Sequence, residues 1–284
     1  MIPAAFEYVR PKSLASAIER LEADPDGSKL LAGGHTLIPT LKLRLASPSV
    51  LIDLNGIAEL RGIGIDRDRI KIGALTTHAD LLSSDELHKT LPIFREAATV
   101  IADPQVRNRG TIGGSLANAD PAADWPAIAI ALQAELDIAG PKGSRRLAAR
   151  DFFIDIFTTA LEPCEVLTGI HVKRTDPNTR FSYRKICHPA SGYAVVGIAT
   201  ALRLDRTVVG ELLIGVTGAA QHAFEGTVAA EFLRGKPLSR ENIDEAARLL
   251  TGSRTYLSDH YASAEYRENL LKVEMRRALL GFLT

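Results

Sequence analysis

Cysteine is scarce in this sequence, and its scarcity excludes several kinds of metal and redox site. The 284 residues include only two cysteines, Cys164 and Cys187, and neither belongs to a Cys-x-x-Cys pair. A standard iron–sulfur cluster takes about four thiolate ligands, so the chain cannot hold one alone. The seven histidines are scattered without the spacing of zinc ligands. We therefore expect no metal site and no structural disulfide in this chain.

Excess charge and long apolar runs are also missing. Lysine and arginine together number 34, and so do aspartate and glutamate, which leaves no net charge. Nucleic-acid-binding domains are commonly basic, so we expect no nucleic-acid partner. No apolar run approaches the ~18 residues of a membrane span, and the N-terminal residues lack the basic and apolar regions of a signal peptide. The sequence therefore predicts a cytoplasmic protein.

The residues that are present form an ordinary balance of 46% apolar and 24% charged, which is typical of a globular protein with a substantial core. Their periodicity divides the chain into three predicted parts. Residues 1–55 are predicted to form a strand–helix–strand–helix–strand unit that ends at Asn55-Gly56, and residues 56–176 a second unit that ends in a polar, turn-rich stretch. Residues 177–284 begin with three predicted strands, at 180–185, 193–204 and 207–217, and end in helices. A tight turn between the last two strands predicts an antiparallel sheet.

Local signals place several helices and one long loop. Ser13 and Ser263 are predicted N-caps, and Thr77 with Asp80 three residues later resembles a capping box. The stretch 103–126 is punctuated by glycine and proline and is predicted to be irregular. A loop of this length inside a compact domain is commonly functional.

Two glycine pairs are the main functional signal. Gly33-Gly34 follows an apolar run and precedes a predicted helix, and Gly113-Gly114 is followed by Ser115. Glycine lets a ligand approach the backbone closely, and backbone N–H groups bind phosphate well. Neither pair belongs to a Walker A or a Gly-x-Gly-x-x-Gly motif. A single glycine pair is more often a simple turn, but two of them together predict a site for a phosphate-bearing ligand.

A resemblance to a known family is carried by three motifs: Ala32-Gly33-Gly34-His35-Thr36-Leu37-Ile38-Pro39, the run from Ile101 to Ser115, and Ala264-Glu265-Tyr266-Arg267. They look like the FAD-binding medium subunit of molybdenum hydroxylases, the xanthine dehydrogenase family. The resemblance covers nearly the whole chain and is strongest to medium subunits of the carbon monoxide dehydrogenase type. It implies an α+β fold, in which a two-subdomain, PCMH-like FAD-binding module precedes a C-terminal domain. That domain would consist of a three-stranded antiparallel sheet and a helical bundle.

The resemblance also implies which residues bind FAD. Backbone amides of residues 32–36 and 111–115 would hold the diphosphate, and Asp124 would face the ribityl or ribose hydroxyls. Lys185 would lie near the polar edge of the flavin, Leu167 would line the ring and Tyr193 would cover it. The complete implied set is Ala32, Gly33, Gly34, His35, Thr36, Leu37, Ile101, Ala102, Thr111, Ile112, Gly113, Gly114, Ser115, Asp124, Leu167, Lys185 and Tyr193. The family often has Ser and Asn where this chain has Thr36 and Ser115.

Simpler interpretations of several of these residues stay open at the level of sequence. Lys185 could be an exposed charge on a strand, Tyr193 could belong to the core, and Asp124 could cap a helix at Trp125-Pro126. A positive charge near N1 of a reduced flavin would stabilise it, which is a reason for a lysine there. His35 could be suspected of covalent attachment to the flavin, but no second feature supports a tether. We therefore expect non-covalent FAD.

The activity implied by the resemblance is that of an electron-transfer subunit without catalytic residues of its own. A large subunit would carry the molybdenum cofactor and a small subunit the [2Fe-2S] clusters, in a dimer of heterotrimers. Electrons would pass through the FAD of this chain to an external acceptor, such as a quinone, oxygen or NAD. The alternatives are a stand-alone flavin oxidase of the same fold, a medium subunit of an aldehyde, purine or N-heterocycle dehydrogenase, and a nucleotide-binding protein without redox chemistry.

Overall fold

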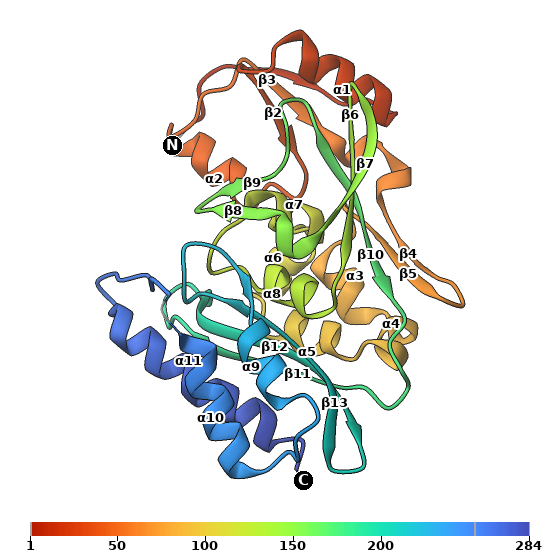
Figure 1. The fold of residues 1–284 in the computed structure, drawn as a ribbon. Coiled ribbons are helices and arrows are strands. Elements are labelled where there is room, and N and C mark those ends of the chain that lie inside the picture. The colour runs from red at the N-terminus through yellow and green to blue at the C-terminus, as the bar shows by residue number, and fades with distance from the viewer. Residues whose placement is uncertain (1, 253, 284) are drawn as a thin grey trace.

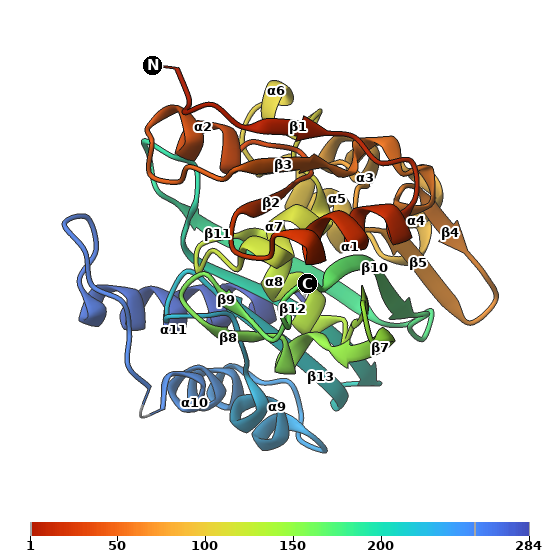
Figure 2. The same ribbon diagram turned by 90° about the horizontal axis from the view of Figure 1, so that it is seen from above.

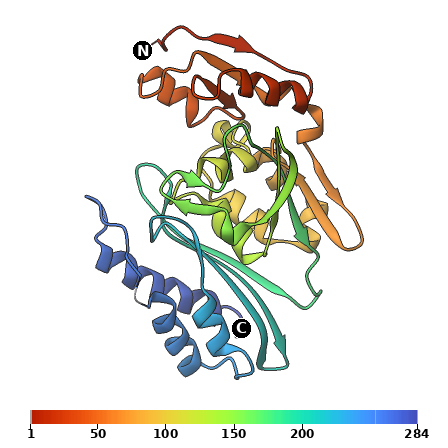
Figure 3. The same cartoon turned by 45° about the horizontal axis from the view of Figure 1, so that its top comes forward.

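The computed structural model describes residues 2–252 and 254–283. The chain folds into three successive parts that lie one below another, each with a β-sheet of its own (Figure 1). The same order is visible when the molecule is tilted, with the N-terminal part at the top and the C-terminal helices at the bottom (Figure 3). No helix among the described residues is both long and apolar enough to cross a membrane.

The first part is a small parallel α/β unit, as predicted. Its elements are β1 (Glu7–Val9), α1 (Leu14–Ala23), β2 (Ser28–Leu31), α2 (Leu37–Lys42) and β3 (Val50–Asp53). The strands lie in the order β1-β3-β2, with β3 parallel to both neighbours. The predicted cap is present at α1, where the Ser13 hydroxyl accepts a hydrogen bond from the Ser16 N–H at 3.2 Å. Viewed from above, α1 and α2 flank this sheet (Figure 2).

The second part is a five-stranded antiparallel sheet with helices packed against it. Its strands, in the order β4-β5-β10-β6-β7, are β4 (Ile63–Ile65), β5 (Arg69–Gly73), β10 (Val166–Lys173), β6 (Glu135–Gly140) and β7 (Gly143–Ala148). A separate hairpin pairs β8 (Phe153–Asp155) with β9 (Thr158–Thr159). The helices are α3 (His78–Ser83), α4 (Asp85–Thr90), α5 (Ile93–Thr99), α6 (Pro104–Arg107), α7 (Ile112–Asn118) and α8 (Asp124–Ala131). The predicted capping box of Thr77 and Asp80 begins α3.

The prediction of a long irregular loop at 103–126 is wrong, because α6, α7 and the start of α8 occupy this stretch. Asp103 and Thr111 each act as an N-cap, with side chains that accept from Val106 N–H and Gly114 N–H. The second glycine pair therefore lies inside the first turn of α7 and not in a turn before it. Glycine and proline favour loops on average, but these caps and the buried contacts of α7 outweigh that preference.

The third part contains the predicted three-stranded antiparallel sheet and adds a short fourth strand. The strands are β11 (Arg180–Cys187), β12 (Ala194–Asp205), β13 (Val208–Thr217) and β14 (Phe224–Glu225), followed by α9 (Thr227–Leu233), α10 (Arg240–Thr251) and α11 (Ala264–Leu280). Alternate residues of β12 face two different cores: Ile198 packs with the C-terminal helices, and Ala199 packs with the core of the second part. The sheet therefore lies between α9–α11 on one face and α8 on the other (Figure 1).

Arg267 explains why the C-terminal motif around it matters to a site far away in sequence. This buried side chain of α11 donates to the carbonyl oxygens of Val195 and Gly218, both at 2.7 Å, and to Asp259 at 2.6 Å. These bonds tie α11 to the beginning of β12, directly after Tyr193. The predicted N-cap of the helix is also present, since Ser263 accepts from the Tyr266 N–H.

The three sheets fall in the three predicted parts. β3 ends at Asp53 and β4 begins at Ile63, while β10 ends at Lys173 and β11 begins at Arg180. The particular boundaries at residues 55/56 and 176/177 stay predictions.

Candidate functional site

The two glycine loops, about 80 residues apart in sequence, lie against each other. A β-carbon built on Gly33 would lie 2.2 Å from the carbonyl oxygen of Arg109 and 2.9 Å from Cα of Gly110. Contacts this short are not tolerated, so only glycine permits this approach of one backbone to the other. The second contact is between Gly114 and Ala32, because a β-carbon on Gly114 would lie 3.6 Å from that of Ala32. The loops thus form one structural unit.

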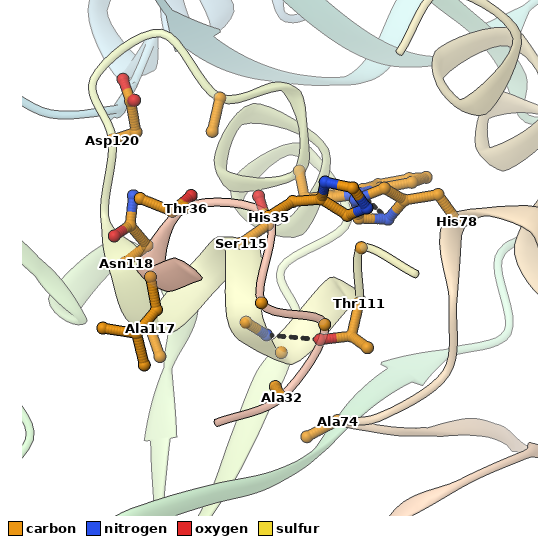
Figure 4. Close-up of a pocket in the computed structure, with 18 of the residues that line it drawn as sticks. Ala32, His35, Thr36, Ala74, His78, Thr111, Ser115, Ala117, Asn118 and Asp120 are labelled. Carbon is orange, nitrogen blue, oxygen red and sulfur yellow. Dashed lines mark hydrogen bonds between the residues drawn. The ribbon is translucent and has the colours of Figure 1, made fainter. Parts of the chain in front are cut away.

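A cavity of about 680 Å³ opens along this unit (Figure 4). Its volume falls within the ~300–1,000 Å³ of small-molecule and cofactor sites. Every residue of the implied FAD-binding set lines the cavity except Ile112. The structure places Ile112 in the core instead, and its N–H donates to the carbonyl oxygen of Thr76 at 3.0 Å.

The backbone amides of the two loops are not equivalent, contrary to the expectation that both would offer N–H groups. In the first loop, the N–H groups of Gly33, Gly34, His35 and Thr36 have no acceptor among the described residues. In the second loop the amides already have acceptors: Ile112 donates to Thr76 O, Gly113 to Ala74 O, and Gly114 and Ser115 to Thr111. The second loop therefore offers the cavity mainly the hydroxyls of Thr111 and Ser115.

The first loop is held by a polar network at the end of β3. The Asn55 side chain donates to the carbonyl oxygen of Ala32 at 2.8 Å and is itself fixed by Asp53, which accepts from it at 2.6 Å. Tyr8 donates to the other oxygen of Asp53. Burial raises the pKa of Asp53, but the bonds from Tyr8 and Asn55 outweigh burial and hold the pKa below its usual value. The sequence gave no signal for Asn55, because its partner lies 23 residues away.

Asp124 and Lys185 form a buried ion pair at the cavity wall, with Nζ to Oδ1 at 2.9 Å. The side chain of Lys185 is only 2% exposed, so the interpretation of this lysine as a surface charge is wrong. Tyr183 donates its hydroxyl to Asp124 at 2.5 Å, and Lys185 also donates to the carbonyl oxygen of Val100 at 3.2 Å. Burial raises the pKa of Asp124 even though Lys185 and Tyr183 lower it, and burial and Asp124 raise the pKa of Tyr183 well above its usual value.

This arrangement changes the meaning of Asp124. Ala123 is the N-cap of α8, so the capping interpretation of Asp124 is wrong. Both carboxylate oxygens already accept hydrogen bonds from Tyr183 and Lys185, which fixes the lysine ammonium at the cavity. The third donor of the ammonium has no acceptor among the residues described, and it is the one available to a ligand.

Tyr193 lies just before β12 and is 43% exposed, so it does not belong to the core. It lines the cavity, and burial, followed by the nearby carboxylates of Asp120 and Asp124, raises the pKa of its phenol. Leu167 on β10 and Ile101 supply a largely buried apolar wall. Ala102 takes a left-handed conformation with φ of 44°, and Arg107 donates to the carbonyl oxygens of Ile101 and Ala102 at this bend.

Several residues of the cavity were missed from sequence, among them His78, Asn118, Asp120 and Trp125. The most unusual is His78, which begins α3 and lies beside His35 and the second loop (Figure 4). The Trp125 indole donates to Nδ1 of His78 at 3.0 Å. Burial, with smaller effects of His35 and Arg107, lowers the pKa of His78 from 6.5 to about 4. Nothing local in the sequence pairs two residues that lie 47 positions apart.

The lowered pKa of His78 predicts a specific loss of stability in acid. Because the folded protein keeps this imidazole neutral down to about pH 4, the unfolded chain takes up the proton first as the pH falls below 6.5. Its stabilising contribution is complete above pH 6.5 and is lost towards pH 4, by about 3 kcal/mol at ~1.4 kcal/mol per pKa unit. The free energy of unfolding of the wild type should therefore fall more steeply over this range than that of His78→Gln. Parallel curves for the two proteins would contradict the neutral buried state.

Comparison with protein families matches nearly the whole chain. Residues 4–174 match the family described as "FAD binding domain in molybdopterin dehydrogenase". Residues 181–282 match the family described as "CO dehydrogenase flavoprotein C-terminal domain".

Individual relatives agree with the family matches. The chain is 39% identical to the carbon monoxide dehydrogenase medium chain of Afipia carboxidovorans, over 98% of this chain and 97% of the relative. It is 36% identical to the glyceraldehyde dehydrogenase medium chain of Sulfolobus acidocaldarius, over 98% of each. Among solved structures, a chain of the reconstituted CO dehydrogenase from Oligotropha carboxidovorans superposes with a TM-score of 0.96 at 39% identity, covering 99% of this chain and 98% of that one.

Proposed function

The chain belongs to the FAD-binding subunits of the molybdopterin dehydrogenases, and on that premise we propose that it transfers electrons from a partner's [2Fe-2S] clusters to an external acceptor. It is an oxidoreductase subunit, and FAD is its cofactor. Bound FAD supplies reversible electron acceptance, which no side chain of this protein provides. The task of the chain is to bind the cofactor, orient it and exclude water around it.

The observation that carries the proposal is the chemical division of the cavity. The unpaired amides of residues 33–36 and the hydroxyls of Thr111 and Ser115 suit the diphosphate oxygens. Leu167 and Ile101 suit an apolar ring system, and Lys185 offers a donor to polar atoms at its edge. These residues fit a non-covalent dinucleotide better than a small polar substrate, because they include no acid–base pair aimed at a reacting bond.

The partners follow from what the chain cannot do itself. Its two cysteines, Cys164 and Cys187, are too few for the about four ligands of a standard cluster. The relatives are called medium chains, so we place the clusters in a small subunit and the molybdenum cofactor in a large one, assembled as a dimer of heterotrimers. The carbon monoxide dehydrogenase type is favoured. A glyceraldehyde dehydrogenase medium chain at 36% identity keeps an aldehyde as the alternative substrate.

The direct test is the cofactor content of the protein purified from its native host. We expect a flavin absorbance spectrum that dithionite bleaches reversibly, with a single FAD per chain released on denaturation. Molybdenum, iron and two further polypeptides should co-purify with it. Their presence would separate the electron-transfer subunit from a stand-alone flavin oxidase.

A fully assembled complex without flavin would refute FAD binding. Flavin in a protein that purifies without molybdenum or iron, and that oxidises a substrate alone, would refute the electron-transfer assignment. Flavin that resists removal by denaturation would refute non-covalent binding.

A further inference from the structure

The His78–Trp125 pair fixes which nitrogen of the imidazole carries the proton. An indole N–H can only donate, so Nδ1 of His78, at 3.0 Å, must be the acceptor. In the neutral ring the proton is then on Nε2. Trp125 is 1% exposed and His78 is 7% exposed, so solvent does not compete effectively for the pair. The result is a neutral ring with one N–H donor in a fixed direction.

That donor has no use inside the protein. His78 lines the cavity, and no described residue accepts a hydrogen bond from its Nε2. A β-carbon at Gly110 would lie 2.7 Å from Nε2, so glycine at this position leaves the nitrogen open. The backbone of His78 is bound to the same residue, since its N–H donates to Gly110 O at 2.9 Å. Nε2 is therefore held beside the start of the second glycine loop.

We infer that His78 is a cofactor-binding residue whose Nε2–H donates to an acceptor atom of the phosphate-bearing half of FAD, with Trp125 as the residue that positions it. The inference rests on the proposed FAD site. The phosphate-bearing half is assigned because Nε2 lies beside Gly110 and His35, and both belong to the glycine loops and not to the wall around Leu167. A neutral donor adds a directed hydrogen bond without adding charge to a cavity that already contains Lys185.

A buried histidine can also serve only to fill space, and the chain offers a matched example. His88 in α4 is 8% exposed, and its Nε2 is bonded to the carbonyl oxygen of Leu81 at 2.7 Å. Its environment therefore resembles that of His78 in burial but not in having a free donor at the cavity. Replacing His88 tests the cost of losing a buried imidazole alone.

The experiment compares FAD affinity among variants of the protein purified with its partner subunits, stripped of flavin and titrated with FAD by fluorescence. His78→Phe keeps the ring and removes the donor, so we expect about tenfold weaker binding. His78→Gln restores a side-chain N–H and should lie within about threefold of the wild type. Trp125→Phe frees Nδ1 and allows the other tautomer, so it should weaken binding by about threefold and add nothing to His78→Phe. His88→Phe should bind FAD as the wild type does.

Wild-type affinity in His78→Phe would overturn the inference, and so would equal losses in the Phe and Gln variants, which would mean packing alone. A loss in His88→Phe as large as in His78→Phe would do the same. If His78→Phe fails to fold, the Gln and Trp125→Phe variants still decide: full loss in Gln, or wild-type affinity in Trp125→Phe, opposes the inference. A wild type that binds no FAD would instead refute the proposed function.

Discussion

Replacing Gly33 by alanine is expected to weaken FAD binding by about 100-fold while leaving the fold intact. The added methyl would lie 2.2 Å from the Arg109 carbonyl oxygen and 2.9 Å from the Gly110 backbone, which are not flexible side-chain ends that could move away. The two loops must therefore separate. Misplacing binding groups by ~1 Å can cost about 10²-fold in function, and overpacking of this kind costs about 1–3 kcal/mol. Flavin absorbance of the purified variant and an FAD titration measure the effect.

Gly64→Ala is the matched control for this substitution. Gly64 lies on β4, and the nearest atom to its added methyl is the Lys71 carbonyl oxygen at 4.0 Å, so neither the loops nor the cavity should change. Far-ultraviolet circular dichroism should be the same in both variants. Wild-type FAD affinity in Gly33→Ala would mean that the cofactor does not bridge the two loops, and the proposed site would have to be moved.

Much of the architecture could be predicted from sequence because its signals are local. The caps at Ser13, Thr77 and Ser263 need only the next three residues, and strand alternation needs only its neighbours. The three sheets were therefore anticipated, together with the two glycine pairs that meet at the cavity. The identity of the cofactor came from the resemblance, because glycine pairs alone point to a phosphate and not to a flavin.

The rest could not be predicted because it depends on contacts between distant parts of the chain. The stretch 103–126 contains many helix-breaking residues, yet α7 forms because its glycines pack closely against Ala74 on the neighbouring strand. Alternation in β11 shows that Lys185 and Tyr183 share one face, but not that α8 covers that face. The role of the second loop changed for the same reason, since its amides are used by residues 74 and 76.

The buried pair of Asp124 and Lys185 should show strong energetic coupling. Lys185→Met leaves a buried carboxylate without its cation, and Asp124→Asn leaves a buried ammonium without its anion. Removing one partner of a buried pair commonly costs about 3–5 kcal/mol, whereas replacing both costs far less. We therefore expect each single variant to lose that much free energy of unfolding in urea. The double variant should be more stable than the sum predicts by at least about 2 kcal/mol.

The exposed pair of Lys142 and Glu162 supplies the control, because its side chains are 88% and 55% exposed at a similar separation of 3.0 Å. Lys142→Met and Glu162→Gln should each change stability by less than about 1 kcal/mol and should add independently. Additive losses at Asp124 and Lys185 would mean that the two charges act separately. Strong coupling means that the charge of Lys185 is largely balanced by Asp124. In that case the lysine presents to the flavin one oriented N–H donor from a nearly neutral pair, rather than a free positive charge, and the tyrosine hydroxyl behind Asp124 helps to hold it there.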